Sequence, residues 1–201
     1  ADLKIRGALC THEYCMDLNE LENHSKMLDA AEKAMDGVDY VLISHGALSQ
    51  QQACEKCVKE TLNQIKTNAL SFVSLLTQLG NRFETKRTGT IASISSVAGD
   101  RGRANNYVYG SAKAMVTAFT SGLRQRLEKA NVSVITIKPG YVETPMTDAF
   151  EKGFLWSKPG KVAARIVHAM DKKKDEVYVP WFWWFIMTII KLIPTKLFKK
   201  L

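Results

Sequence analysis

A serine, a tyrosine and a lysine are spaced so that they can build a proton-transfer site. Ser96 precedes Tyr109 by 13 positions and Lys113 follows Tyr109 by 4, in the stretch SSVAGDRGRANNYVYGSAK. Residues four apart lie on one face of a helix, and apolar residues recur at helical spacing between positions 112 and 127. Ser96 stands at the end of GTIASIS, a run typical of a buried strand. A strand end and a helix face would therefore meet at one reacting oxygen.

Each residue type has a chemical reason. A phenol with an ordinary pKa near ~10 is a poor proton relay at neutral pH, and a nearby cation lowers that pKa. We expect Lys113 to supply the cation for Tyr109, and Ser96 to donate a hydrogen bond to a carbonyl or alkoxide oxygen. The alternative is an amphipathic helix on which Tyr and Lys stand four apart by coincidence. The serine and the segments described below favour the site.

The elements that must position these residues alternate along the chain. The short apolar runs VDYVLIS, GTIASIS, SVITIK and EVYVP are rich in Val and Ile and predict strands. Helical patterns occupy residues 18–35, 61–83, 106–129 and 159–171. This alternation predicts an α/β fold, a doubly wound parallel sheet covered by helices on both faces. Ligands of such sheets bind beyond the carboxyl ends of the strands, where the three residues lie.

Three segments, SSVAG, YVYGSAK and IKPGYVETPM, occur in the order and at the spacing found in one enzyme family. The chain resembles the short-chain dehydrogenase/reductase family. The resemblance implies that Tyr109 is the catalytic acid/base, that Lys113 tunes it and holds the nicotinamide ribose, and that Ser96 orients the substrate. Asn68 matches the asparagine that completes the tetrad and anchors a water in the proton relay.

The same resemblance implies a Rossmann-like three-layer sandwich and NADP or NAD as cofactor. Pro139 and Gly140, followed by Thr144, match the turn that contacts the nicotinamide carboxamide, and the pair Asp17-Leu18 matches residues near the adenine. The implied cofactor-binding residues are Asp17, Leu18, Gly46, Tyr109, Lys113, Pro139, Gly140, Val142 and Thr144.

Two segments depart from the family pattern. The chain has Ser44-His45-Gly46-Ala47 where the family has Asn-Asn-Ala-Gly, which moves the glycine by one position. The Gly-rich phosphate-binding turn is missing, since the opening ADLKIRGA reads as the tail of a helix. We expect the first two strands and first helix to be missing from the sequence as given. Either the chain is truncated or it contains only an ordered part.

The cysteines raise the question of a metal. Cys54 and Cys57 form a C-x-x-C pair, and Cys10 and Cys15 are two further thiols. We expect residues 10–15 to lie on a buried strand, where side chains five apart face opposite ways. The sequence therefore predicts no metal site and four reduced thiols. His45 is the one histidine near the expected cofactor cleft, and we expect it to line that cleft.

Positive charge and aromatic side chains gather at the carboxyl end. Residues 151–201 hold 11 Lys and Arg against 4 Asp and Glu, whereas residues 1–150 hold 17 against 16. The block WFWWFIM precedes scattered lysines, a pattern typical of a lipid headgroup boundary and not of a nucleic-acid interface. The uncharged run 177–190 is too short to span a bilayer. The alternative is a tail packed on a partner subunit or on the sheet. Pro194 is expected to divide the segment into two short helices.

We therefore expect two parts, residues 1–179 as an amino-terminally incomplete Rossmann-like catalytic domain and residues 180–201 as a hydrophobic and basic tail. The tail and the HGAL turn resemble members related to the decaprenylphosphoryl ribose 2-keto reductases. That resemblance implies a ketone on a lipid-linked sugar, and a cytoplasmic enzyme peripheral to the inner face of the cytoplasmic membrane.

The sequence as a whole predicts an NAD(P)-dependent oxidoreductase that acts on a carbonyl or alcohol substrate. The substrate is expected to enter over residues 146–158, which carry no strong core pattern. The segments 61–83 and 106–129 have wide apolar faces, and the family pairs such helices, so we expect a homodimer or homotetramer. The alternative is a non-catalytic binding or scaffolding protein of the same fold that has lost nucleotide binding.

Overall fold

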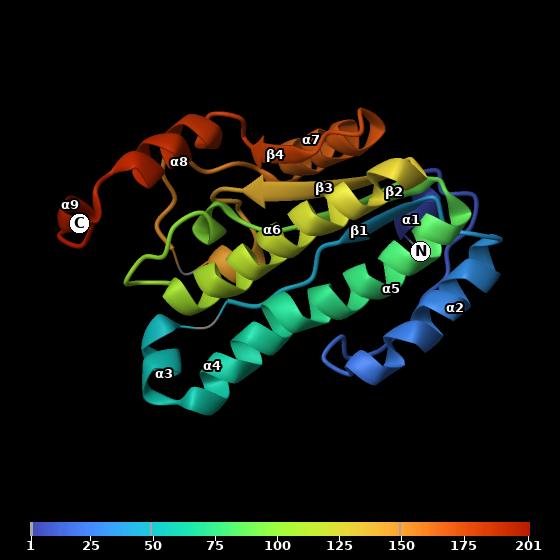
Figure 1. Cartoon of the computed structure of the whole chain (residues 1–201), viewed down its shortest axis with the longest axis horizontal. Coiled ribbons are helices and arrows are strands. Elements are labelled where there is room, and N and C mark those ends of the chain that lie inside the picture. Colours follow the sequence, from blue (N-terminus) through green and yellow to red (C-terminus); the bar gives the residue numbers. More distant parts are fainter. Residues whose placement is uncertain (1, 49, 149) are drawn as a thin grey trace.

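The computed structural model describes residues 2–48, 50–148 and 150–201, and its centre is a parallel sheet (Figure 1). Within these residues the sheet has four strands in the order β1-β2-β3-β4. The parallel pairing aligns Ile94 with Ile137 and Pro139 with Val179, so the carboxyl ends of the strands meet at one edge. The strands are β1 Tyr40–Ile43, β2 Gly89–Ile94, β3 Val132–Pro139 and β4 Glu176–Val179.

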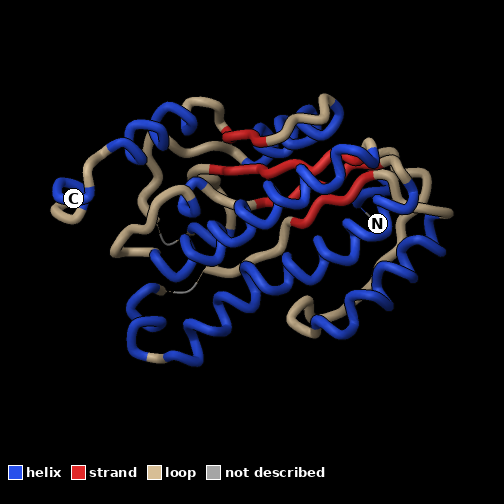
Figure 2. The backbone as a smooth tube through the Cα atoms, viewed as in Figure 1, coloured by secondary structure: helices blue, strands red, loops and turns tan. Residues whose placement is uncertain are grey.

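Helices surround this sheet on both faces, as the colouring in Figure 2 makes clear. Short turns of 3-10 helix are η1 Leu21–Asn23, η3 Val97–Gly99, η4 Glu128–Ala130 and η5 Pro145–Thr147, and η2 Lys66–Leu70 is a π-helix between α4 and α5. The α-helices are α1 Asp2–Ile5, α2 His24–Met35, α3 Gln51–Lys56, α4 Val58–Ile65, α5 Ser71–Lys86, α6 Tyr107–Leu127, α7 Pro159–Asp171, α8 Trp183–Leu192 and α9 Thr195–Phe198.

Successive side chains of the strands point to opposite faces of the sheet, and each face has its own hydrophobic core. Ile91 and Val134 join the core formed with α2, α5 and α6, whereas their neighbours Ala92 and Ile135 join the core formed with α7. Successive strand side chains point to opposite faces, so a sheet covered on both faces needs apolar residues at nearly every position. The predicted α/β architecture with helices on both faces is confirmed.

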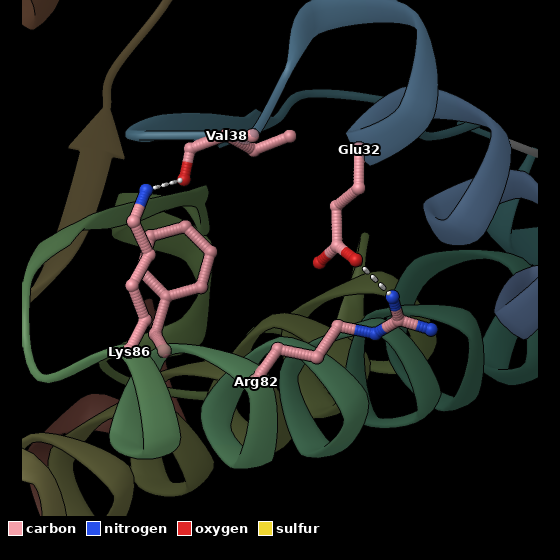
Figure 3. Close-up of a pocket in the computed structure, with 6 residues that line it drawn as sticks. Glu32, Val38, Arg82 and Lys86 are labelled. Carbon is pink, nitrogen blue, oxygen red and sulfur yellow. Dashed lines mark hydrogen bonds and ion pairs between the residues drawn. The ribbon is translucent and has the colours of Figure 1, made fainter.

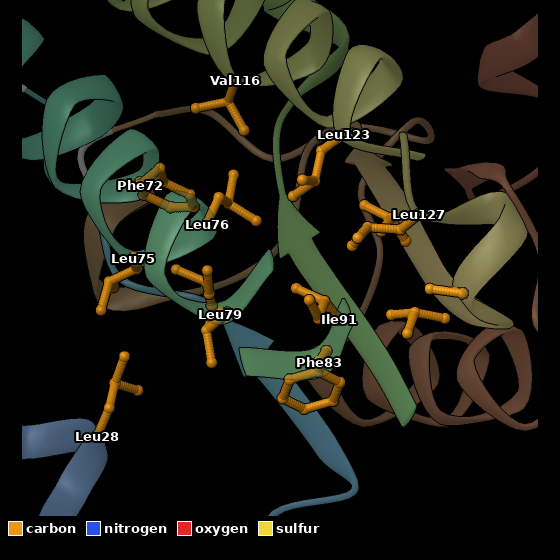
Figure 4. Close-up of a cluster of buried hydrophobic side chains, with 14 residues drawn as sticks. Leu28, Phe72, Leu75, Leu76, Leu79, Phe83, Ile91, Val116, Leu123 and Leu127 are labelled. Atoms are coloured by element: carbon orange, nitrogen blue, oxygen red, sulfur yellow. The ribbon is translucent and has the colours of Figure 1, made fainter. Parts of the chain in front are cut away.

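Helix α5 packs into the larger core through residues spaced three and four apart (Figure 4). Its buried stripe consists of Phe72, Leu75, Leu76, Leu79 and Phe83. Gly80 lies on the side of the helix that meets α6, where an added Cβ would stand 2.8 Å from Leu123 Cδ1. The small residue lets α5 and α6 approach closely, and α6 in turn carries Tyr109 and Lys113.

The four predicted strands are observed, and the helical predictions hold with small changes at their ends. Helix α7 begins and ends where the pattern predicts, at 159 and 171. The pattern over 61–83 spans two α-helices joined by the five-residue π-helix, a local change of hydrogen bonding that hydrophobic spacing alone does not reveal. Helix α3 was not predicted.

One local prediction is wrong. Residues 8–16 form no strand, and Cys10 and Cys15 are exposed. A strand needs a neighbouring ladder for its N–H and C=O groups, and this segment pairs with none of the four strands described. Cys54 is buried and Cys57 exposed, and among the described residues no three His, Cys, Asp or Glu side chains gather where they could hold a metal ion.

The tail divides at Pro194 as predicted, since α8 ends at Leu192 and α9 begins at Thr195. Its aromatic residues do not share one environment. Trp183 is buried in a cluster with Tyr178 and Met187, which corrects the expectation that all three neighbouring tryptophans suit an interface. In the part of the chain that is described, no helix combines the length and apolar character needed to cross a membrane.

Candidate active site

The loops that follow β1, β2 and β3 line one cavity of ≈ 860 Å³ at the carboxyl edge of the sheet. In Figure 1 this edge is the left side of the view, toward which the arrowhead of β3 points and where α3 and α8 also lie. His45, Ser96, Tyr109 and Lys113 all contribute to the wall of the cavity. The structure therefore brings together residues that the sequence separates by up to 68 positions.

A smaller pocket of ≈ 240 Å³ lies between α2 and α5 (Figure 3). Its charged groups are already paired. Arg82 donates to Glu32 Oε2 at 2.8 Å, and Lys86 Nζ donates to Asp39 Oδ1 at 2.7 Å and to Val38 O at 2.9 Å. Because these charged groups are already paired with one another, we interpret the small pocket as part of a surface ion-pair network. The candidate site is the larger cavity.

Ser96 lies two residues beyond the end of β2 and caps the turn η3, where its Oγ accepts a hydrogen bond from Ala98 N at 3.1 Å. The turn packs directly on α6 because both sides carry glycine. A Cβ on Gly110 would stand 2.8 Å from Ala98 O, and a Cβ on Gly99 would stand 2.8 Å from Ala114 N. These backbone contacts bring the hydroxyl of Ser96 to the first turn of α6, where it forms a hydrogen bond with Tyr109.

Lys113 lies one helical turn beyond Tyr109 and is only 2% exposed. Its Nζ donates to Ile94 O at 2.9 Å and stands 4.3 Å from the centre of the Phe72 ring. No carboxylate of the described residues forms an ion pair with it. Burial disfavours the charged form and lowers the pKa of Lys113 from 10.5 to about 8.

Tyr109 does not have the low pKa that the sequence suggested. Burial raises the pKa of its phenol, while the hydrogen bond with Ser96 lowers it to a smaller degree. The ammonium of Lys113 stands 5.8 Å from the centre of the tyrosine ring and binds the Ile94 carbonyl instead. In this structure desolvation therefore outweighs the cation, and Tyr109 holds its proton at neutral pH.

Asn68 lies in the π-helix, completely buried, and holds the turn after β1. Its Nδ2 donates to Ala47 O at 2.8 Å and its Oδ1 accepts from Ala47 N at 3.0 Å, while Nδ2 also donates to Gln64 O at 3.1 Å. A Cβ on Gly46 would stand 2.9 Å from Asn68 Oδ1, so glycine is required at the displaced position. The side chain of Asn68 thus fixes the turn that contains Gly46 and Ala47 beside Lys113.

His45 lines the cavity, as expected. Its Nε2 shares a 2.6 Å hydrogen bond with Ser71 Oγ, and its ring stacks on Phe72 with centroids 4.4 Å apart. Burial, followed by the charge of Lys113, lowers the pKa of His45 from 6.5 to about 4. The imidazole is therefore neutral at pH 7, and it packs beside the lysine without adding a second positive charge.

The turn after β3 forms the opposite wall of the cavity. Pro139, Gly140, Val142 and Thr144 all line it. Thr144 begins η5 with a capping box to Thr147, which fixes the direction in which the chain leaves the sheet.

The pair Asp17-Leu18 lies outside this cavity. Asp17 Oδ1 accepts from Asn19 N at 2.9 Å, and Leu18 O bonds His24 Nε2 at 3.0 Å. Neither residue is part of the cavity wall, so their expected contact with a cofactor stays a prediction.

A buried ionic network behind Ser96 was missed by sequence reasoning. Lys138 Nζ donates to Asp100 Oδ1 at 2.7 Å and to Glu176 Oε1 at 3.0 Å, and the Tyr178 hydroxyl donates to Asp100 Oδ2 at 2.6 Å. Burial and the charge of Asp100 raise the pKa of Tyr178. The network joins the end of η3 to β3 and β4. Its sequence signal was a charge in each of two apolar strands, Lys138 and Glu176.

Comparisons with known proteins agree with this geometry. The family model described as short chain dehydrogenase matches residues 7–153. An uncharacterized oxidoreductase of Mycobacterium tuberculosis is 30% identical over 201 residues, which cover 100% of this chain and 81% of that protein. An acetoacetyl-CoA reductase of an Acinetobacter species is 26% identical over 169 residues, covering 77% of this chain and 68% of the reductase.

A similar arrangement of elements occurs among solved structures. A short chain dehydrogenase from Burkholderia cenocepacia, determined in complex with NADP, superposes with a TM-score of 0.80 at 16% sequence identity. The match covers 94% of this chain and 80% of the other. At this identity the likeness concerns the fold.

The buried lysine makes a prediction about pH and stability. Unfolded, Lys113 titrates near 10.5, and folded near 8, so between these values the unfolded chain binds more protons and stability rises with pH. We expect Lys113→Met to be more stable than the wild type at pH 7, by at most about 3 kcal/mol before the lost hydrogen bond is subtracted. The advantage should disappear near pH 10.5. Urea unfolding at both pH values measures it.

The exposed Lys59, changed to Met, is the matched control and should show no such pH dependence. An advantage of Lys113→Met that is equal at pH 7 and pH 10.5 would show that packing, and not the buried charge, causes it.

Proposed function

Since the chain belongs to the short-chain dehydrogenase family, we propose that it is an NAD(P)-dependent reductase of a ketone, with Tyr109 as the proton donor. One observation carries the proposal. A serine hydroxyl, a protonated tyrosine and a buried lysine without a carboxylate partner converge on the wall of one cavity.

The residues present fit the nicotinamide end of such a cofactor. Lys113 uses one protein acceptor, so its ammonium has further protons for ribose hydroxyls. Gly46 and Gly140 line two walls of the cavity, where their missing side chains let Asn68 and Trp183, respectively, pack closely against the backbone. Asn106 Oδ1, on another wall, is buried with no hydrogen-bond partner among the described residues. Lys113, Gly46 and the 139–144 turn would hold the nicotinamide riboside.

When bound, the reduced nicotinamide supplies a hydride to the carbonyl carbon of the substrate. Tyr109 donates its phenolic proton to the carbonyl oxygen, which completes the alcohol. Its raised pKa keeps that proton in place at neutral pH. Ser96 donates a hydrogen bond to the same oxygen and so orients it. The charge of Lys113 stabilises the phenolate that is left, and Asn68 holds the HGAL turn beside the lysine.

The alternative of a non-catalytic scaffold gains no support from this geometry. Burying an ammonium against one carbonyl and one ring costs stability, because the charge loses its hydration. A protein that only binds a partner through its surface has no use for that cost. Ionisable groups whose pKa is shifted by burial in a cavity are typical of catalytic sites.

The substrate we propose has an apolar body attached to its ketone. Most of the accessible surface of the cavity wall is apolar, although glutamine, asparagine and arginine side chains also line it. Met146, Thr147 and Phe150 form part of its rim, which supports entry over residues 146–158. The resemblance of the tail to keto reductases of lipid-linked sugars supports a substrate of that class.

We further propose that the tail rests on an anionic membrane surface. Helix α8 is anchored by its buried side, Trp183 and Met187, while its other side is exposed. The exposed apolar residues are Trp181, Trp184, Phe185, Ile189 and Leu192. Lys191, Lys196, Lys199 and Lys200 are also exposed. Aromatic rings with nearby lysines favour the headgroup boundary. The site would then act at the inner face of the cytoplasmic membrane.

Self-association through α4, α5 and α6 is the remaining part of the proposal. Most of the apolar surface of these helices is already used in the core. Val58, Leu62, Leu70 and Met115 nevertheless remain exposed on them. A homodimer or homotetramer that covers this surface would need an interface beyond ~1,000 Å².

The catalytic proposal is tested by Tyr109→Phe, which keeps the ring and removes the proton donor. We expect turnover of an NADPH-dependent ketone reduction to fall by ~10²–10⁴-fold, with little change in melting temperature. Tyr107→Phe, on the exposed side of the same helix turn, is the control and should leave turnover unchanged. Activity of Tyr109→Phe within a few-fold of wild type would contradict the assignment.

The membrane proposal is tested by liposome co-sedimentation of the double variant Trp184→Ser, Phe185→Ser. These residues are exposed, so the change should spare the fold and reduce binding to anionic vesicles by tenfold or more, on the order of 1–2 kcal/mol. Tyr14→Ser, equally exposed but outside the tail, is the control. Binding should also weaken with added salt, because screening acts over ~8 Å at physiological ionic strength. Equal binding of both variants would refute the proposal.

The assembly proposal is tested by sedimentation velocity at micromolar concentration. The wild type should sediment as a dimer or tetramer, and Leu62→Lys with Met115→Lys should shift it toward monomer, because a lysine is costly to bury in an interface. Leu3→Lys, an exposed site on α1, should have no effect. A wild type that is monomeric at this concentration would rule the assembly out.

A further inference from the structure

The wall of the catalytic cavity carries positive charge and no carboxylate. Among the described residues that line it, Arg103 and Lys113 are the basic side chains besides His45, which is neutral at pH 7, and none is an Asp or a Glu. Acids on the same segments of chain stay outside the wall, namely Glu55, Glu143 and Asp148. A ligand that enters this cavity therefore meets a positive potential.

Arg103 is the cation that the proposed reaction does not use. It is half-buried, and among the described residues its guanidinium forms no ion pair, no side-chain hydrogen bond and no ring contact. Arg101, two positions earlier, is by contrast committed to carbonyls at the end of α8. A guanidinium has five N–H donors and no acceptor, so an uncommitted one in the wall of a cavity is suited to an anion.

Arg103 and Lys113 are attached on opposite sides of the proton donor along the chain. The carbonyl of Arg103 accepts a hydrogen bond from Asn106 N at 3.1 Å, in the turn that leads into α6. Tyr109 lies in the first turn of that helix, and Lys113 lies one turn further along. The end with the lysine holds the nicotinamide riboside in the proposed function, so the end with the arginine is left for the substrate.

We propose that Arg103 binds an anionic group of the substrate, a carboxylate or a phosphate carried on the body of the ketone. The planar guanidinium matches either group with two parallel hydrogen bonds. Because most of the accessible wall is apolar, this attraction is screened less than on an open surface. The substrate is then a ketone with an apolar body and a negative charge. This inference rests on the proposed function, since it concerns the substrate of the same site.

The test compares pairs of ketones with NADPH as the reductant. Each straight-chain keto acid, with the ketone at successive positions, is paired with its carboxamide, and each keto alkyl phosphate with its alcohol. The wild type should have the higher kcat/KM for the anion in at least one pair. Arg103→Gln should lower this preference by about 10–100-fold, because the charged contact is lost. The change should fall on KM and not on kcat, since the contact is made equally in the ground and transition states. Arg103→Lys keeps the charge without the planar fork and should retain part of the preference.

Arg165→Gln removes the same charge from an exposed position on α7, outside the cavity wall, and should leave the preference unchanged. Because the guanidinium of Arg103 has no partner, its variants should melt at the temperature of the wild type. An anion preference that survives Arg103→Gln, or equal kcat/KM within every pair, would overturn the inference alone. A rise in the KM for NADPH without a change in preference would also overturn it, because the arginine would then bind a cofactor phosphate. If the wild type reduced no ketone of either series, the proposed function itself would fall.

Discussion

The ammonium of Lys113 is buried against one carbonyl oxygen and one aromatic ring, and the catalytic end of the molecule is arranged around that charge. Phe72 offers the face of its ring, and Ile94, at the end of β2, offers its carbonyl. His45 stacks on the same phenylalanine and stays neutral, because burial and then the charge of Lys113 lower its pKa. Asn68 and Gly46 then close the space above the lysine without adding an acid. An acid here would hold the ammonium in an ion pair, and its protons would not be free for a ligand.

Contacts between backbones set the position of the serine relative to the tyrosine. Gly99 and Gly110 let the turn η3 rest on the first turns of α6 with no side chain between them. Behind the turn, Asp100 is tied to Lys138 and Tyr178, so the far end of the turn is attached to the last two strands. A buried ion pair of this kind adds little net stability, because desolvation offsets the attraction. The network does fix the orientation of the Asp100 side chain, since each of its two carboxylate oxygens accepts a hydrogen bond from a different residue.

Helix α8 of the tail has one buried side and one exposed side. The buried side contributes Trp183 to the cavity wall, and Arg101, in the loop that follows Ser96, donates to the carbonyls of Ile190 and Ile193 at the end of the helix. The exposed side presents aromatic and aliphatic residues, among them Trp184, Phe185 and Ile189.

The sequence by itself determined the strands, most of the helices, the pairing of Tyr109 with Lys113 on one helix face, and the division of the tail at Pro194. These features follow from local rules, such as periodicity of 2 or 3.6 residues and the missing N–H of proline, that act within a few positions. The order of the motifs also pointed to Ser96, Gly46 and the 139–144 turn, which line one cavity in the structure. It pointed as well to Asn68, which holds the turn beside that cavity.

Only the tertiary structure decided the environments. The pKa of Tyr109 is raised because the surrounding protein removes water from the phenol, and no spacing along the chain reports how much water is lost. Residues 8–16 lack a strand because a strand depends on its neighbours. Trp183 is buried while its neighbour Trp184 is exposed, and the indole of Trp183 fits because Gly140, 43 positions earlier in the chain, has no side chain. Burial and pairing between distant segments are properties of the packed molecule, and the chain order does not contain them.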